Sequence, residues 1–258
     1  MPQHTQASAA EIGIRRNSVV PRTPPYTGPV SHRCWKLSPA DFAFLWDECP
    51  RCFYLKVVLG FPRPRPLVPK VVSRIDERMK AGCEGRRTET LASDMPAGVF
   101  EFGERWVESQ PIDVHLPDAV HRCLLQGTLD TVVRLDDGGY AVVGFQMGER
   151  RAEQVPVDTR QLHAYAYALE HPARGAVGLA PITRLGLLVF EPETFAREAA
   201  GLGALTGGLS WVEIPRDDGL LFGFLAEVLS VLERPEPPGG APLCGWCVYR
   251  DASRRTGL

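Results

Sequence analysis

The sequence predicts a mixed α/β fold. Three observations lead to this prediction: a block of three strand-like segments in the middle of the 258-residue chain, helical periodicity on both sides of that block, and one more apolar strand before the last helix. The composition, 44% hydrophobic and 23% charged, is ordinary for a globular protein with a buried core.

The chain begins without regular periodicity. Residues 1–33 are polar and proline-dotted, so we expect them to be largely disordered and residues 34–258 to form a single domain. A helix is expected in LSPADFAFLWDECPRCFYLKVVLG, because Ser38 can cap it, Pro39 suits its first turn and an apolar stripe follows. FPRPRPLVP must be extended, since proline removes backbone donors and fixes φ. KVVSRIDERMKAGCEG is expected to form a second helix that ends at glycine.

The three central strands are expected at about residues 99–109, 124–135 and 140–145, and DDGG between the last two is a strong hairpin signal. DTRQLHAYAYALE then predicts a helix with one apolar side. RLGLLVFEP predicts a buried strand, and DDGLLFGFLAEVLSVLERPEPP predicts an amphipathic helix ended by prolines.

Charge and hydropathy exclude some classes of function. The net charge is −2, so any contact with nucleic acid must come from local basic patches. No apolar run approaches the ~18 residues of a membrane span, and the N-terminus lacks the apolar stretch of a secretory signal, so we expect a cytoplasmic protein.

Four of the seven cysteines form two CxxC pairs, Cys49/Cys52 and Cys244/Cys247. Two such turns can complete a tetrahedral four-sulfur site for zinc, or hold an iron–sulfur cluster, and either would join the two ends of the domain. The alternatives are unrelated buried thiols or, more weakly, thioredoxin-like redox chemistry. The remaining cysteines are expected to be single thiols: Cys34, Cys83 and Cys123.

A second group of polar residues centres on the motif GTLDTVV, which places Asp130 in an apolar strand. A carboxylate there is costly unless it binds a metal or finds a polar partner. The hairpin brings Asp130 beside AVVGFQM, and Gln161 and Tyr165 share one face of the next helix, where they could equally be a mutually satisfied pair. His163 is expected to be a partly exposed helix residue and not a ligand.

Together, GTLD, the hairpin, YAVVGFQMGE and QLHAY resemble the PD-(D/E)XK nuclease superfamily in its RecB-like branch. LSPADFAFLWDECPRCFYL and CGWCVYR are similar to the flanking segments of members that carry an iron–sulfur cluster, so the resemblance spans about Leu37 to Arg250. It implies a restriction-endonuclease-like αβββαβ core with a mixed sheet. The activity that it implies is Mg²⁺- or Mn²⁺-dependent phosphodiester hydrolysis of DNA.

By this resemblance Asp130 would hold the metal, and Gln161 and Tyr165 would contact substrate or brace the site. The second metal-binding acid of the family falls on Gly144, and its catalytic lysine falls on Gln146, which would orient the attacking water. Glutamine can still hydrogen-bond a water, whereas glycine offers no side chain.

Glu77 and Glu84, on the helix before the sheet, could supply an additional ligand, and nothing in the sequence selects between them. Glu149 would face the opposite side of the strand from Gly144 and could help only if the chain turns there. The cysteines also depart from the family pattern, because they split two and two where the relatives split one and three. Small arginine clusters could contact phosphates or simply be solvated: Arg63 and Arg65, Arg86 and Arg87, and Arg150 and Arg151.

Three hypotheses follow for function. The first is a nuclease impaired by Gly144 and Gln146. The second is a catalytically silent nucleic-acid-binding or scaffold protein with the nuclease fold, and the third is an unrelated interaction domain held together by zinc. Protein partners are not identifiable from the sequence.

Overall fold

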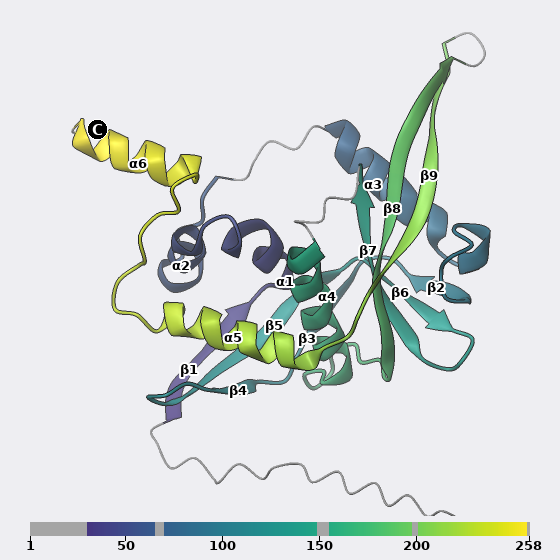
Figure 1. Ribbon diagram of the computed structural model, residues 1–258. Helices are drawn as coiled ribbons and strands as arrows, with labels where there is room; N and C mark the ends of the chain where they lie inside the picture. Colours follow the sequence, from purple (N-terminus) through teal and green to yellow (C-terminus); the bar gives the residue numbers. More distant parts are fainter. Residues whose placement is uncertain (1–29, 65–69, 149–154, 198–200, 257–258) are drawn as a thin grey trace, which may run out of the picture.

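The computed structural model describes residues 30–64, 70–148, 155–197 and 201–256, which form six α-helices and two β-sheets (Figure 1). The helices are α1 (Pro39–Asp41), α2 (Pro50–Leu59), α3 (Lys70–Cys83), α4 (Val155–Glu170), α5 (Asp218–Leu232) and α6 (Gly245–Arg255). The strands are β1 (Val30–Leu37), β2 (Gly98–Phe102), β3 (Arg105–Glu108), β4 (Ile112–His115), β5 (Val120–Leu129), β6 (Thr131–Leu135), β7 (Tyr140–Met147), β8 (Ile182–Arg197) and β9 (Gly203–Ile214). The mixed α/β prediction is confirmed at this level.

The first sheet is built around β5, which pairs in parallel with β1 and antiparallel with β3 and β4. The second sheet has the order β2-β6-β7-β8-β9. In it β2, β6 and β7 are antiparallel neighbours, and β8 returns parallel to β7 after the crossover through α4.

Two of the predicted strands are each divided between the sheets. Residues 124–135 were expected to be one strand, but β5 ends at Leu129 and β6 starts at Thr131, so Asp130 lies at the point where the chain passes from the first sheet to the second. The segment 99–109 divides in the same way into β2 and β3, which pair with β6 and β5. The expectation that Asp130 lies within an apolar strand is therefore wrong, because a break places this carboxylate outside both ladders.

Other boundaries agree more closely. The DDGG hairpin joins β6 to β7, with Gly138 at φ +89° supplying the left-handed residue of the turn. β1 begins at Val30, inside the segment expected to be disordered; the rest of that segment lies outside the described residues. The first predicted helix is split into α1, a π-helical turn over Phe42–Trp46, and α2. Residues 65–69 of the proline-rich segment also lie outside the described residues.

The second sheet is covered on both faces. On one face, Leu162 and Leu169 of α4 pack with Leu185 and Leu187 of β8, in a core that continues through α5, α2 and the first sheet. On the other face, Phe100 and its neighbours form a smaller core beneath the end of α3. Burial on both faces explains why β8 reads as an unbroken apolar run and not as an alternating one.

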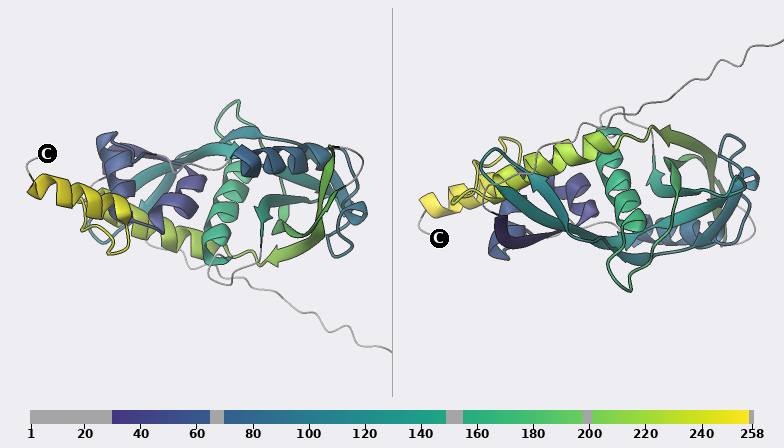
Figure 2. Two further views of the ribbon diagram at one scale, coloured as in Figure 1. Left: turned by 90° about the horizontal axis from the view of Figure 1, so that it is seen from above. Right: turned by 90° about the horizontal axis from the view of Figure 1, so that it is seen from below.

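Beyond the core, the outer halves of β8 and β9 project as a two-stranded arm beside α3 (Figure 1). The strand β9 was not predicted, because the glycine-rich GALTGGLS shows no apolar alternation. At the opposite end of the molecule α6 lies next to α2, as both views of Figure 2 show. Within the described residues, no helix is long and apolar enough to cross a membrane.

Candidate functional site

A cavity of about 300 Å³ lies where the two sheets meet, between α3, α4 and the junction of β5 and β6. Four of the residues singled out from the sequence line it: Asp130, Gly144, Gln161 and Tyr165. The structure therefore brings together side chains that are 35 residues apart in the chain. Gln146 is not among the lining residues, and Glu149 lies outside the described residues.

Asp130 is held by a lysine that the sequence did not point out. The ammonium of Lys80, on α3, donates a hydrogen bond to Asp130 Oδ1 at 2.7 Å, and it also contacts Asp76 at 2.9 Å and Glu104 at 3.4 Å. Only 13% of the Lys80 side chain is exposed. A cation thus already occupies the space beside Asp130, and it is supplied by the protein itself.

The protonation of this group follows from burial and from charge. Burial raises the pKa of Asp130, against the opposing effect of the hydrogen bond from Lys80. Burial acts to lower the pKa of Lys80, but the contacts with Asp130 and Asp76 outweigh it and raise that pKa above its ordinary value. Lys80 is consequently charged throughout the physiological range.

Tyr165 and Gln161 belong to the same site but are engaged with each other and with the backbone. The Tyr165 hydroxyl donates to the Thr128 carbonyl at 2.6 Å and shares a hydrogen bond with the Gln161 side chain, while burial raises its pKa. A Cβ at Gly127, the glycine of the GTLD motif, would lie 3.3 Å from Pro39 Cδ and 3.4 Å from this hydroxyl, so Gly127 lies directly beneath both side chains. Tyr165 thereby fixes α4 against the strand that ends at Asp130.

Gly144 is buried on β7 beside two leucines. A Cβ built there would lie 2.9 Å from Leu187 Cδ2 and 3.5 Å from Leu162 Cδ2. An acidic side chain at this position would enter the cavity only by displacing the end of a flexible leucine. Position 144 therefore supplies no charge, and its surroundings are apolar.

Two more carboxylates line the cavity, those of Asp76 and Asp158. Asp158 lies on α4 three residues before Gln161, and burial raises its pKa to about 6. It is thus mostly ionised at pH 7 and becomes half-protonated about one pH unit lower. Sequence reasoning missed both Asp158 and Lys80, although each shares a helix face with a residue of the site.

Asp130, Asp76 and Glu104 all contact the Lys80 ammonium, but their carboxylate oxygens do not lie close enough to one another to share a metal ion. Among the described residues, the only group of three or more potential metal ligands whose ligand atoms lie close enough to share an ion is the group of four cysteines. Glu77, on α3, and Glu84, in the turn directly after it, were both considered as extra ligands, but both are exposed and neither lines the cavity. The Mg²⁺ or Mn²⁺ expected at Asp130 stays a prediction without a converging ligand set.

The four cysteines do come together. The Sγ atoms of Cys49, Cys52, Cys244 and Cys247 all lie within 4.8 Å of one another, and all four residues are buried. The cluster is compatible with a zinc ion or an iron–sulfur centre, as the spacing of the motifs indicated. The other cysteines, Cys34, Cys83 and Cys123, are separate free thiols, as expected.

Several arginines proposed for phosphate contact are engaged within the protein. Arg63 forms a salt bridge with Glu48, and Arg87 forms a two-armed one with Asp136. Arg86 is exposed, and the remaining candidates, Arg65, Arg150 and Arg151, lie outside the described residues.

We expected His163 to be partly exposed, but it is buried. Its Nδ1 donates to the Thr159 carbonyl at 2.7 Å, and its Nε2 accepts from the backbone N–H of Asp217, the N-cap of α5, at 2.8 Å. The expectation that it is not a ligand agrees with these bonds, which give it a structural role.

Comparison with known proteins adds little to this geometry. No family model matches the sequence, and no curated protein does. The solved structure of SSO0001 aligns over 84% of this chain and 84% of its own, with 12% sequence identity and a TM-score of 0.42. A likeness of that size assigns neither a family nor a function to the chain.

Proposed function

We propose that the chain is a nucleic-acid-binding protein built on a restriction-endonuclease-like, PD-(D/E)XK core in which metal-dependent cleavage is silent. The observation that carries this proposal is the contact between Lys80 and Asp130, in which an ammonium fills the place that a catalytic metal would need. The four-cysteine site would hold zinc or an iron–sulfur cluster as a structural link.

The order of elements supports the choice of core. The helix α3 precedes the antiparallel strands β2, β6 and β7, and α4 then leads to β8 parallel to β7. That is the αβββαβ order that the resemblance implies, with β3, β4 and β5 inserted as part of the first sheet. Asp130, Gln161 and Tyr165 fall where the motifs of that core would meet.

The metal chemistry of the cavity supports an absence of cleavage. Mg²⁺ gives up its waters reluctantly and needs carboxylates to offset that cost. Here Gly144 offers none, and a metal would first have to displace the Lys80 ammonium from Asp130, against an attraction strengthened by burial. Gln146 does not line the cavity and therefore does not replace what is missing.

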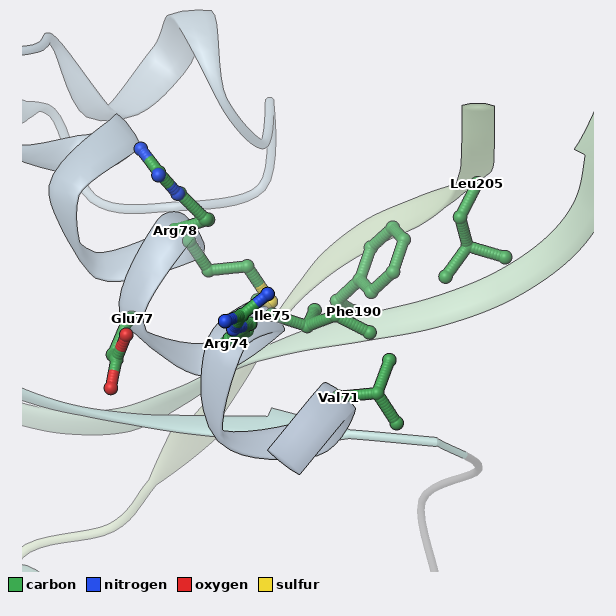
Figure 3. Close-up of a pocket in the computed structure, with 8 residues that line it drawn as sticks. Val71, Arg74, Ile75, Glu77, Arg78, Phe190 and Leu205 are labelled. Carbon is green, nitrogen blue, oxygen red and sulfur yellow. The ribbon is translucent and has the colours of Figure 1, made fainter. Parts of the chain in front are cut away.

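A groove lined by apolar side chains, two arginines and one carboxylate, that of Glu77, supports nucleic-acid binding. It has a volume of about 750 Å³ and lies between α3 and the β8–β9 arm (Figure 3). Arg74 and Arg78, one helical turn apart, line it together with Phe190 and Leu205. Neither arginine has an ion-pair partner within the described part of the chain. Guanidinium groups suit phosphates, and an aromatic ring in the same groove suits an unstacked base.

A second candidate function is an active metal-dependent nuclease. It is favoured by the presence of Asp130, Gln161 and Tyr165 around one cavity. In that case Mg²⁺ or Mn²⁺ would displace Lys80 once substrate phosphates add their charge to that of Asp130.

The two candidates are separated by measuring binding and cleavage on the same samples. Labelled single-stranded and duplex DNA and RNA are titrated with wild-type protein at several salt concentrations, and cleavage is followed with Mg²⁺ or Mn²⁺. We expect salt-sensitive binding without cleavage. Reversal of both groove charges, Arg74→Glu with Arg78→Glu, should weaken binding by about tenfold or more, because two phosphate contacts become repulsive.

The matched control reverses two exposed arginines on α6, Arg254→Glu with Arg255→Glu, and should leave the affinity within about twofold. Metal-dependent cleavage that disappears in Asp130→Ala would establish the second candidate in place of the first. Equal nucleic-acid affinities in the groove variant and the α6 variant would show that the groove is not the binding site.

A further inference from the structure

The two cysteine pairs occupy equivalent places on two helices. Cys49 is the N-cap of α2, and Cys244 is the N-cap of α6; Cys52 and Cys247 lie in the first turns of the same helices. The N-terminal end of each helix therefore faces the sulfurs.

Short sulfur–sulfur contacts join the two pairs. Sγ distances are 3.7 Å for Cys49–Cys247, 3.7 Å for Cys52–Cys244 and 3.6 Å for Cys52–Cys247, and each of these distances joins α2 to α6. Four thiolates at ~2.3 Å from one zinc ion in a tetrahedron lie about 3.8 Å from each other. The observed spacing is that of a single central ion.

An iron–sulfur cluster requires a different spacing. In a [4Fe–4S] centre each thiolate binds its own iron, and in a [2Fe–2S] centre the two irons each take a separate pair of thiolates. In either cluster, thiolates on different irons lie farther apart than the 4.8 Å that encloses all four Sγ atoms here. The short contacts between the pairs therefore do not fit the cluster that the resemblance implies.

Arginines surround the sulfurs. Buried nitrogens of Arg51 (Nε), Arg63 (Nη1) and Arg250 (Nε) have no hydrogen-bond partner within the described residues. Arg63 and Arg250 line a small apolar cavity together with Cys52 and Cys247. A divalent ion with four thiolates has a net charge of −2, and guanidinium groups around it would offset that charge and direct N–H groups toward sulfur.

We propose that this site holds one zinc ion in tetrahedral four-thiolate coordination, not an iron–sulfur cluster, and that the ion docks α6 onto α2. Cys247 is the only buried residue of α6, so the helix adds no other buried side chain to the core. Apart from the sulfurs, the two helices are joined by the salt bridge of Arg51 with Asp251, which is 3.0 Å long and partly exposed. Without the ion, little remains to hold α6 in place.

Metal identity is tested on full-length protein expressed with ample iron and purified without oxygen. Elemental analysis, sulfide assay and the visible spectrum should give about one zinc per chain, no inorganic sulfide and no charge-transfer colour. Cys244→Ser should lose the zinc, whereas Cys34→Ser, which changes a half-buried thiol outside the cluster, should keep it. Two or more irons per chain with sulfide, or one iron in place of zinc, would overturn the assignment, as would a metal-free protein.

The docking role has a separate readout that does not need a substituted cysteine. Zinc is removed from the wild-type protein by a chelator under reducing conditions, and amide hydrogen exchange is compared before and after. We expect protection in residues 245–255 to fall by about tenfold or more, while α4 and β7 keep theirs. Unchanged protection of α6, or loss of protection throughout the chain, would overturn the docking role and leave the metal assignment to the first experiment.

Discussion

Replacement of Lys80 by methionine should destabilise the protein, because the buried carboxylate of Asp130 loses its cation. Methionine keeps most of the length and apolar volume of lysine but removes the ammonium that contacts Asp130 and Asp76. Asp130 then remains a largely buried carboxylate without its cation. The loss should therefore come from Asp130 and not from packing.

The magnitude follows from the distance and the exposure. At 2.7 Å and an effective dielectric constant of about 20, the attraction between the two charges is about 6 kcal/mol. Desolvation of both groups cancels most of it, because 13% of the Lys80 side chain and 30% of the Asp130 side chain are exposed. We expect a net loss of about 1–3 kcal/mol in the free energy of unfolding at pH 7.

The loss should depend on pH in a defined direction. Burial gives Asp130 a higher pKa in the folded protein than in the unfolded chain, so ionising it costs the folded state free energy. That cost is absent below the unfolded pKa of ~3.9 and is complete above the folded pKa. Without Lys80 the folded pKa rises further. The deficit of the variant should consequently be full at pH 7 and shrink as the pH falls toward 4.

Urea unfolding followed by tryptophan fluorescence at several pH values measures this. The double variant Lys80→Met with Asp130→Asn should recover about half or more of the loss, since both charges are then removed. Lys56→Met, which removes an ammonium 2.6 Å from Asp41 but more exposed to water, should cost less than about 1 kcal/mol. A loss in Lys80→Met that is as small as in this control, or that does not change with pH, would refute the reasoning.

Two further predictions concern buried polar contacts. His163→Leu should lower the free energy of unfolding in urea by about 1–3 kcal/mol, because the backbone N–H of Asp217 loses its acceptor. His171→Leu, at an exposed position, should lower it by less than about 0.5 kcal/mol, and equal losses in the two variants would contradict the role of His163. Burial acts to raise the pKa of Glu170, but the hydrogen bonds from Arg216 outweigh burial and lower that pKa. The contact therefore stabilises the folded state above the unfolded pKa of ~4.3, and this stabilisation is lost as the pH falls through the pKa of the folded state. Arg216→Met should therefore be less stable than wild type above about pH 5 and should approach it in acid, and a gap that does not narrow would count against this pair.

The sequence predicted the helices and the cysteine cluster better than it predicted the strands. Two CxxC motifs in one chain favour a shared four-sulfur site, and their Sγ atoms do lie within 4.8 Å of one another. Periodicity could not show that one apolar run would serve two sheets, because β5 and β6 are separated only by Asp130. The polar residue that we read as a functional group inside a strand also marks the point where the strand ends.

The candidate site was predicted only in part. Asp130, Gln161 and Tyr165 share motifs and proved to share a cavity, whereas Gln146 does not line it. Lys80 belongs to a helix about 50 residues earlier, and nothing local distinguishes it from other lysines on a charged helix face. Its role arises only from the tertiary packing of α3 against the junction of the sheets.

The silent-site proposal depends most directly on whether Asp130 binds a divalent metal. Mn²⁺ binding, measured by electron paramagnetic resonance on wild-type protein and on Asp130→Ala, answers this without any substrate. We expect the two titrations to coincide, because Lys80 already occupies the position beside Asp130. One bound Mn²⁺ in the wild type that is missing in Asp130→Ala would contradict the proposal and favour an active nuclease.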